Sequence, residues 1–196
     1  MIAGATAAQA NLLINGGFEI PNANYTLINP GTEPSGFGWA VTTNSVEVMD
    51  NAFFGGTFNA PEGTHSLDLV GINVGGGISQ TFATQAGKSY RLSFYTGNWV
   101  NTMSLAMSVI NGASTILSQS YSRPGSQSLV WQQETPLTFV ATGSSATVSF
   151  QDTAGFDGNG MHLDGVDISL VPEPASMVLF GSGLLGLAAS RRRKAV

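Results

Sequence analysis

Residues 89–99, SYRLSFYTGNW, decide the fold class of this chain. Tyr90, Leu92 and Phe94 point to one side of an extended segment, and the residues between them point to the other. A period of two with large apolar residues on one side is typical of a β-strand with one face in a core and the other in water. The segment therefore predicts a half-buried strand.

The same alternation recurs along the chain. Residues 103–109, MSLAMSV, set Met, Leu and Val against Ser and Ala, and residues 146–152, ATVSFQD, set Ala, Val and Phe against polar residues. These runs lie between clusters of Gly, Asn, Ser and Thr, and no stretch of residues 11–171 has a convincing helical period. Because a parallel sheet needs helical crossovers, the pattern predicts an all-β, antiparallel β-sandwich in one domain, residues 11–171.

The last predicted strand contains an irregularity. In GMHLDGVDISLV, residues 160–171, Met161 and Leu163 share one face, whereas Val166 and Ile168 are in the opposite phase. One extra residue at positions 164–165 would return all four side chains to the same face, and the glycine there tolerates an unusual backbone. We therefore expect a β-bulge that re-aims the carboxylate of residue 164.

Composition limits the function of this domain. Residues 11–171 carry three basic residues, Lys88, Arg91 and Arg123, against eleven acidic ones, a net charge of −8. Such a surface is unsuited to a phosphate backbone, so we expect no nucleic-acid partner. The chain has no cysteine, so its stability must come from packing and from any bound ion.

The first ten residues, MIAGATAAQA, are small and end in an Ala-Gln-Ala pattern of the kind that signal peptidase accepts. They lack the basic start and the full apolar segment of a complete signal peptide. We interpret residues 1–10 as the remnant of a signal peptide, with the mature chain beginning at Asn11. A disordered N-terminus is the alternative.

Residues 172–196 join a Pro-Glu-Pro tripeptide, an apolar run and a basic end. Residues 175–190 carry no charge and, at about 1.5 Å per helical residue, would span roughly 24 Å. This predicts a short transmembrane helix, and the basic residues after it predict a cytoplasmic end and an exported body. The alternative is a buried C-terminal helix, which the three glycines of the run and the basic end disfavour.

This tail resembles the PEP-CTERM sorting signal of Gram-negative bacteria. The residues that carry the resemblance are Pro172, Glu173, Pro174, Arg191, Arg192 and Arg193. The resemblance implies processing by an exosortase-type membrane peptidase and transient anchoring in the inner membrane. It also implies a final location in the cell envelope, on the cell surface or in the extracellular matrix.

The body has a second resemblance, carried by blocks in a fixed order. The blocks are NLLINGGFEIP, Gly38-Trp39, SVEVMD, PEGTHSLDL, GGISQTF, GKSYRLSFY, the strand around Trp131 and LDGVDISL. Together they are similar to the domain-of-unknown-function family 642 (DUF642), found in plant cell-wall proteins and in bacteria. The resemblance implies a galactose-binding-like jelly roll, extracellular placement and polysaccharide or cell-wall partners. Plant members carry paired cysteines and usually two such domains, so their partner specificities are not transferred to this cysteine-free single domain.

The second resemblance also implies a metal site. In related jelly rolls, a structural calcium ion lies between the first and last strands and is held by the Glu of the NGxFE motif and an Asp of the last strand. Here these residues are Glu19 and Asp164. Calcium takes about six to eight oxygen ligands, so carbonyl or Asn oxygens would have to complete the site. The alternative is that Glu19 hydrogen-bonds a loop and Asp164 caps a turn.

Sugar recognition usually needs flat aromatic faces beside polar side chains. Arg91, Tyr95 and Trp99 share one parity, so a strand that continues through Gly97 would place them on one outward face. We predict this face as the ligand-binding patch. The alternative is that Trp99 folds over the edge of the sandwich into the core.

No catalytic motif is present in the sequence. His65 and His162 stand without metal-ligand spacing, and the chain has neither a nucleophile elbow nor a cysteine. We therefore expect a non-catalytic, exported envelope or matrix protein that binds polysaccharide. The alternative is a structural or adhesive matrix protein with protein partners and no glycan recognition.

Overall fold

The computed structural model describes residues 9–56, 58–155 and 158–172. Within these ranges the chain forms β-strands and one short 3-10 helix. The elements are β1 (Tyr25–Ile28), β2 (Ala40–Thr43), β3 (Val46–Asp50), η1 (Phe53–Gly55), β4 (His65–Asp68), β5 (Gly77–Ala83), β6 (Ser89–Asn98), β7 (Met103–Asn111), β8 (Ser114–Arg123), β9 (Val130–Gln133), β10 (Leu137–Val140), β11 (Ser145–Asp152) and β12 (His162–Leu170).

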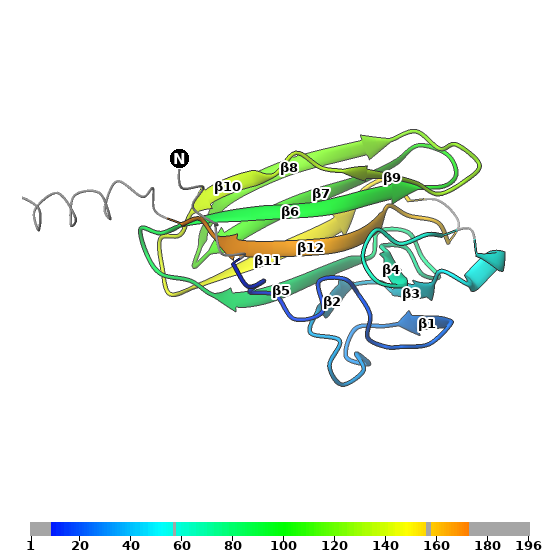
Figure 1. Cartoon of the computed structure of the whole chain (residues 1–196), viewed down its shortest axis with the longest axis horizontal. Helices are drawn as coiled ribbons and strands as arrows, with labels where there is room; N and C mark the ends of the chain where they lie inside the picture. The colour runs from blue at the N-terminus through cyan, green and yellow to red at the C-terminus, as the bar shows by residue number, and fades with distance from the viewer. Residues whose placement is uncertain (1–8, 57, 156–157, 173–196) are drawn as a thin grey trace, which may run out of the picture.

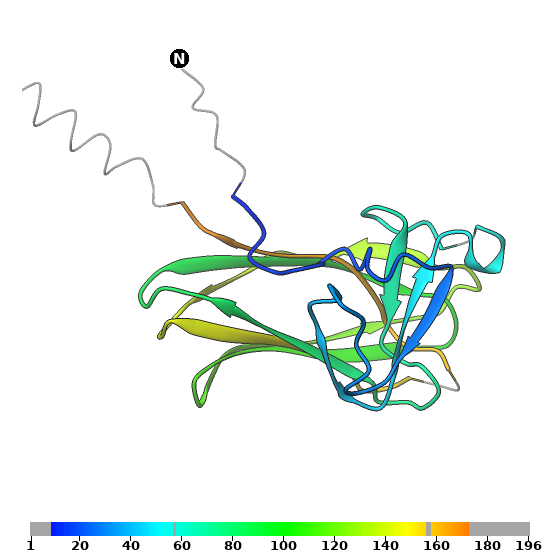
Figure 2. The same ribbon diagram turned by 90° about the horizontal axis from the view of Figure 1, so that it is seen from below.

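The strands form two sheets that lie face to face (Figures 1 and 2). The larger sheet has the order β1-β3-β4-β12-β6-β10, with β9 also pairing with β6. The smaller sheet has the order β2-β5-β11-β7-β8. Every strand pairing in the described ranges is antiparallel, which confirms the predicted all-β antiparallel sandwich.

One hydrophobic core fills the space between the two sheets. Tyr90, Leu92 and Phe94 of β6 are buried in it, as their alternation predicts. The ring of Phe94 meets that of Phe150, in β11 of the smaller sheet, edge-on with centroids 5.1 Å apart. Apolar burial of this kind, contributed by one face of each sheet, is the main force that holds a sandwich together.

Strand β12 contains the predicted bulge. Asp164 lies opposite Tyr95 of β6, but the next pair along β6 joins Ser93 to Asp167, so β12 holds one extra residue. Gly165 in the bulge has a φ of 55°, in the left-handed region that favours glycine. The apolar residues on both sides of the bulge are buried, so the extra residue restores their common face.

The N-terminal segment runs beside the second half of β12, beyond the part that pairs with β4. The amide of Leu12 donates to the carbonyl of Ile168 (2.8 Å), and the amide of Val166 donates to the carbonyl of Gly16 (2.9 Å). A Cβ atom on Gly16 would lie 2.0 Å from the carbonyl oxygen of Val166, so only glycine allows the two segments to come this close. Both ends of the described chain consequently lie at the same end of the sandwich (Figure 2).

Several sequence predictions concern residues outside the described ranges. These are the signal-peptide remnant up to residue 8 and the predicted transmembrane helix and basic tail within residues 173–196. Pro172 is the only residue of the predicted sorting signal that is described. In the part of the chain that is described, no helix has the length and apolarity needed to cross a membrane.

Candidate functional site

A row of chemically varied side chains crosses the outer face of the larger sheet. The strand register places Glu47 opposite Asp68, Asp68 opposite His162, His162 opposite Gly97 and Gly97 opposite Trp131. Directly opposed residues of antiparallel strands point to the same face. Sequence positions far apart are thus brought together on β3, β4, β12, β6 and β9.

The loop between β3 and β4 covers part of this face. The indole nitrogen of Trp131 donates to the backbone carbonyl of Phe58 (2.9 Å), and the amide of Glu62 donates to Oδ2 of Asp164 (2.7 Å). Phe58 is only 2% exposed, although it lies on the outside of the sheet. The loop therefore buries side chains on the outer face of the larger sheet, at one end of that sheet.

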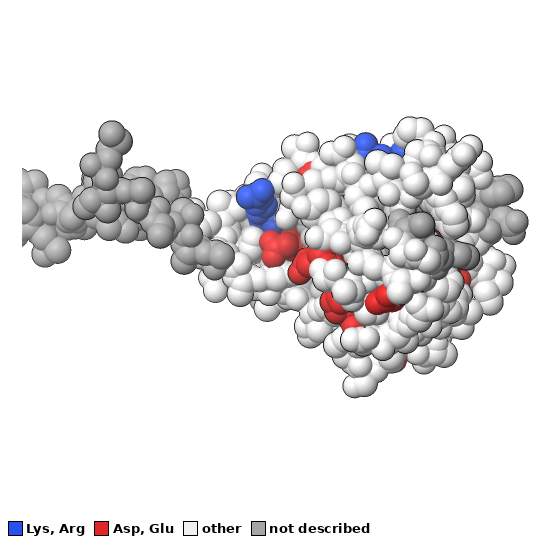
Figure 3. All heavy atoms as spheres, turned by 45° about the vertical axis from the view of Figure 1, so that its right-hand side comes forward, with Lys and Arg blue, Asp and Glu red and all other residues white. Residues whose placement is uncertain are grey.

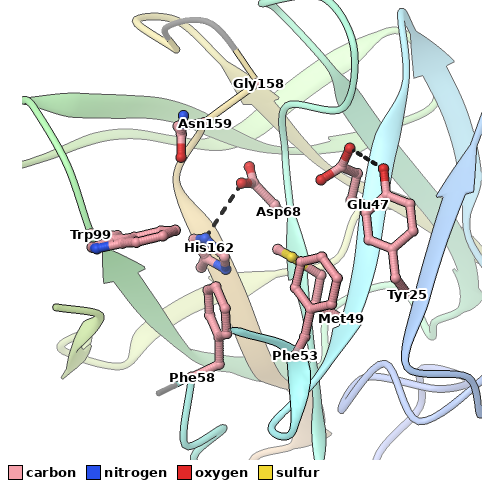
Figure 4. Close-up of a pocket in the computed structure, with 10 residues that line it drawn as sticks. All are labelled: Tyr25, Glu47, Met49, Phe53, Phe58, Asp68, Trp99, Gly158, Asn159 and His162. Atoms are coloured by element: carbon pink, nitrogen blue, oxygen red, sulfur yellow. Dashed lines mark hydrogen bonds and ion pairs between the residues drawn. The ribbon is translucent and has the colours of Figure 1, made fainter. Parts of the chain in front are cut away.

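A pocket of about 420 Å³ opens between this loop and the row of side chains (Figure 4). Its lining residues are Tyr25, Glu47, Met49, Phe53, Phe58, Asp68, Trp99, Gly158, Asn159 and His162. Figure 4 shows Trp99 on one side of the pocket and the Tyr25–Glu47 pair on the other, with Asp68 and His162 between them. The pocket thus combines aromatic side chains with carboxyl, hydroxyl, imidazole and amide groups.

The Tyr25–Glu47 pair is a hydrogen bond in which the Tyr25 hydroxyl donates to Oε1 of Glu47 (2.5 Å). Burial raises the pKa of Glu47 above its ordinary value, and the hydrogen bond from Tyr25 opposes that rise. Burial also raises the pKa of Tyr25, with the Glu47 hydrogen bond acting in the same direction. Tyr25 therefore keeps its proton and fixes the orientation of the Glu47 carboxyl.

Asp68 and His162 form a second pair, deeper in the pocket. Nε2 of His162 lies 3.3 Å from Oδ2 of Asp68, and the amide of Val70 donates to Oδ1 of Asp68 (2.8 Å). Burial raises the pKa of Asp68 well above its ordinary value and lowers the pKa of His162 to about 3. The Nδ1 atom of His162 is buried and has no hydrogen-bond partner among the described residues. A buried polar atom of this kind calls for a partner from a ligand or water.

Aromatic rings form one wall of the pocket. The ring of Phe58 meets that of Trp99 edge-on, with centroids 5.7 Å apart, and lies 5.5 Å from the ring of His162. Phe53 connects this group to Tyr25, with ring centroids 5.2 Å apart in a stacked arrangement. Edge-to-face and offset contacts fix the orientation of such rings. The rings of this wall are therefore held in fixed orientations.

The predicted ligand patch is divided by the structure. Trp99 follows the end of β6 and lines the pocket, whereas Arg91 and Tyr95 do not. Arg91 and Tyr95 lie on the outer face of the same strand, opposite Ser169 and Asp164 of β12. Their role in ligand binding stays a prediction, separate from the pocket.

Glu19, one predicted calcium ligand, is held by four polar groups. Its Oε1 accepts from the amides of Thr64 and His65 (2.9 Å each), and its Oε2 lies 3.2 Å from Oγ1 of Thr64 and 3.1 Å from Nδ1 of His65. Burial alone would raise the pKa of Glu19, but hydrogen bonds from His65 and Thr64 lower it below its ordinary value. In this arrangement Glu19 fastens the covering loop to the N-terminal segment.

Asp164, the other predicted calcium ligand, is fully buried. Its two oxygens accept from the amides of Glu62 and Gly165, each at 2.7 Å. Burial raises the pKa of Asp164 to about 7. No group of three His, Cys, Asp or Glu side chains suited to a metal gathers within the described ranges. As placed, Glu19 accepts hydrogen bonds from the covering loop and Asp164 accepts from two backbone amides, and calcium binding stays a prediction.

Three pocket residues, Tyr25, Glu47 and Asp68, were not singled out from the sequence. A weak signal was present in β3, VEVMD, where Glu47 and Met49 share the face opposite the core. An apolar residue on a face that is expected to contact water indicates that another segment of the chain covers that face. The partner strands and the covering loop, however, follow only from long-range pairing.

Comparison with known families confirms both resemblances found in the sequence. The chain matches the family described as protein of unknown function (DUF642) over residues 11–161. It also matches the PEP-CTERM protein-sorting motif over residues 170–194. The sorting motif indicates that the protein is exported.

Similar individual proteins give further context. Halomucin of Haloquadratum walsbyi (strain DSM 16790 / HBSQ001) is 28% identical over 182 residues, which cover 88% of this chain and only 2% of halomucin. An arabinose-bound α-L-arabinofuranosidase has a TM-score of 0.52 at 15% identity, covering 85% of this chain and 27% of that one. The carbohydrate-binding module TmCBM61 in complex with β-1,4-galactotriose has a TM-score of 0.49 at 16% identity, covering 84% of this chain and 99% of that one. The arabinofuranosidase likeness concerns the fold alone, and the match over residues 11–161 shows that this chain belongs to the DUF642 family.

Proposed function

We propose that this protein is an exported, non-catalytic module that binds polysaccharide in the cell envelope or extracellular matrix. The observation that carries the proposal is the pocket of about 420 Å³ on the larger sheet, where aromatic and hydrogen-bonding side chains stand together. Pyranose rings present an apolar face that packs on aromatic rings and hydroxyl groups that pair with polar side chains. The pocket offers both in one place.

Each part of the pocket has a separate task in this proposal. Trp99 packs against a sugar ring from one side, and Glu47, oriented by Tyr25, accepts hydroxyl hydrogen bonds from the other. The Asp68–His162 pair forms the polar floor of the pocket. Because these groups are held by the sheet and the loop, little ordering is needed on binding.

The sorting motif supports the location of this activity. A galactose-binding-like jelly roll with a PEP-CTERM tail would pass through the membrane, be processed by an exosortase-type peptidase and remain at the surface or in the matrix. In that location an exopolysaccharide is an abundant ligand. The polysaccharide, rather than a soluble metabolite, is therefore the proposed partner.

Affinity electrophoresis tests the proposal. The purified full chain, kept soluble with mild detergent, is run through gels that contain bacterial or plant polysaccharides. We expect at least one polymer to retard the protein, and Trp99→Ala to abolish the retardation while leaving the unfolding curve largely unchanged. Tyr95→Ala is the matched control, since Tyr95 lies near the end of β6, four residues before Trp99, and does not line the pocket.

Other outcomes are equally clear. Loss of retardation in Tyr95→Ala but not in Trp99→Ala would move the site to the predicted patch along β6. Loss of folding in Trp99→Ala would show that Trp99 is a core residue. Free migration of the folded protein through every gel would favour a structural or adhesive matrix protein without glycan recognition.

A further inference from the structure

The pocket carries acidic groups without basic ones. Its described lining includes Glu47 and Asp68 but no Lys or Arg. The described ranges contain three basic residues. Arg123 is paired with Glu134, and Arg91 lies along β6 outside the pocket. Lys88 lies at the opposite end of β6 from Trp99, which lines the pocket. Figure 3 shows acidic side chains gathered on one face of the molecule, with few basic ones.

This charge pattern bears on the chemistry of the ligand. Uronate and sulfate groups are normally bound by Arg or Lys, and Arg does so with two parallel hydrogen bonds. Here an anionic sugar would meet the Glu47 carboxyl and no Lys or Arg, so its charge would lose hydration without gaining a cationic partner. From these contacts we infer that the pocket takes an uncharged polysaccharide and excludes acidic ones, an inference that rests on the proposed function.

The surroundings also disfavour a cationic ligand. Met49, Phe53, Phe58 and Trp99 give the pocket largely apolar walls, so an ammonium group would lose its hydration there. Both carboxyl groups are already engaged, Glu47 by the Tyr25 hydroxyl and Asp68 by the Val70 amide.

Chemical conversion of one polymer tests this inference. A neutral polymer that retards the full chain is oxidised so that its primary hydroxyl groups become carboxylates, and a part of the product is methyl-esterified to remove the charge again. At low ionic strength we expect the dissociation constant to rise at least about tenfold on oxidation and to recover on esterification. Glu47→Gln should reduce that penalty, while Asp167→Asn, which removes one acid outside the lining, should leave it unchanged.

The outcomes separate this inference from the proposed function. Trp99-dependent binding of an acidic polymer, or of a cationic one such as chitosan, would overturn the inference and keep polysaccharide binding at the pocket. An equal penalty in the parent chain and in Glu47→Gln would show that Glu47 does not set the selectivity and would also overturn it. Polymer binding that does not depend on Trp99 would overturn the inference and move the site away from the pocket, whereas absence of binding to any polymer would overturn both.

Discussion

The two outer faces of the sandwich differ sharply in chemistry. The smaller sheet presents mainly hydroxyl side chains, such as Thr81 and Thr147, whose oxygens lie 2.8 Å apart across β5 and β11. The larger sheet presents buried Asp68, His162 and Asp164 beneath a covering loop. Both sheets contribute side chains to the one core, so the core does not explain the difference. Buried polar groups are costly and are retained where they serve a site.

The largest expected effect concerns the covering loop. Phe58→Ala should lower the free energy of unfolding by about 3 kcal/mol, because the buried ring packs against Phe53, Trp99 and His162. Ser149→Ala, on the outer face of the smaller sheet, should change it by less than about 0.5 kcal/mol. Urea unfolding followed by circular dichroism measures both. Equal effects would show that the two outer faces do not differ in the way described.

The second effect is a pH dependence that comes from Asp164. Its pKa rises from 3.8 to about 7 on folding, so its contribution to stability is full below about pH 4 and is lost as the pH rises through about 7. Between these values the free energy of unfolding should fall by up to about 1.4 kcal/mol per pH unit because of this group. Asp164→Asn should remove that slope.

The difference between parent and variant isolates Asp164 from other titrating groups. Unfolding curves are compared at several pH values from 4 to about 8. Asp167→Asn, three residues along the same strand, is the control and should keep the parental slope. A parental slope in Asp164→Asn would mean that Asp164 is ionised in the folded protein at low pH.

A smaller effect is expected where the N-terminal segment meets the loop. Glu19→Ala should cost about 1–3 kcal/mol, because the amides of Thr64 and His65 lose their acceptor. Amide hydrogen exchange of residues 58–65 should quicken more than that of β11. Unchanged protection in the loop would show that Glu19 does not fasten it.

The smallest expected effect is that of a chelator. Because the oxygens of Glu19 already meet four polar groups and those of Asp164 accept two backbone amides, calcium and EDTA should give the same thermal midpoint. Differential scanning calorimetry of the full chain measures the thermal midpoint with calcium and with EDTA. A midpoint that falls with EDTA in the parent but not in Glu19→Gln would establish the predicted calcium site.

The sequence predicted the inner faces well for a simple physical reason. Alternation in a strand is local, so Tyr90, Leu92 and Phe94 could be assigned to the core from a few residues. The bulge at Asp164 was also predictable, because a change of phase within one strand requires an extra residue.

The pocket was harder to predict because it depends on pairing between distant strands. Asp68 and His162 are 94 positions apart and meet only because β4 and β12 are neighbours. Trp99 was identified as a ligand residue by its parity with Arg91, yet it lines the pocket because the chain turns after β6. The alternation within a strand predicts which face of the sheet a side chain lies on. It does not predict which loop residues contact that side chain.

The course of β12 determines where the pocket lies relative to the C-terminal end of the described chain. The strand begins at His162, in the pocket, and ends at Leu170, two residues before the last described residue. At about 3.3 Å per residue these two points lie roughly 26 Å apart. A molecule tethered through its C-terminal end would therefore hold the pocket at its far end. The single strand β12 would then act as a spacer of fixed length between the tether and the pocket.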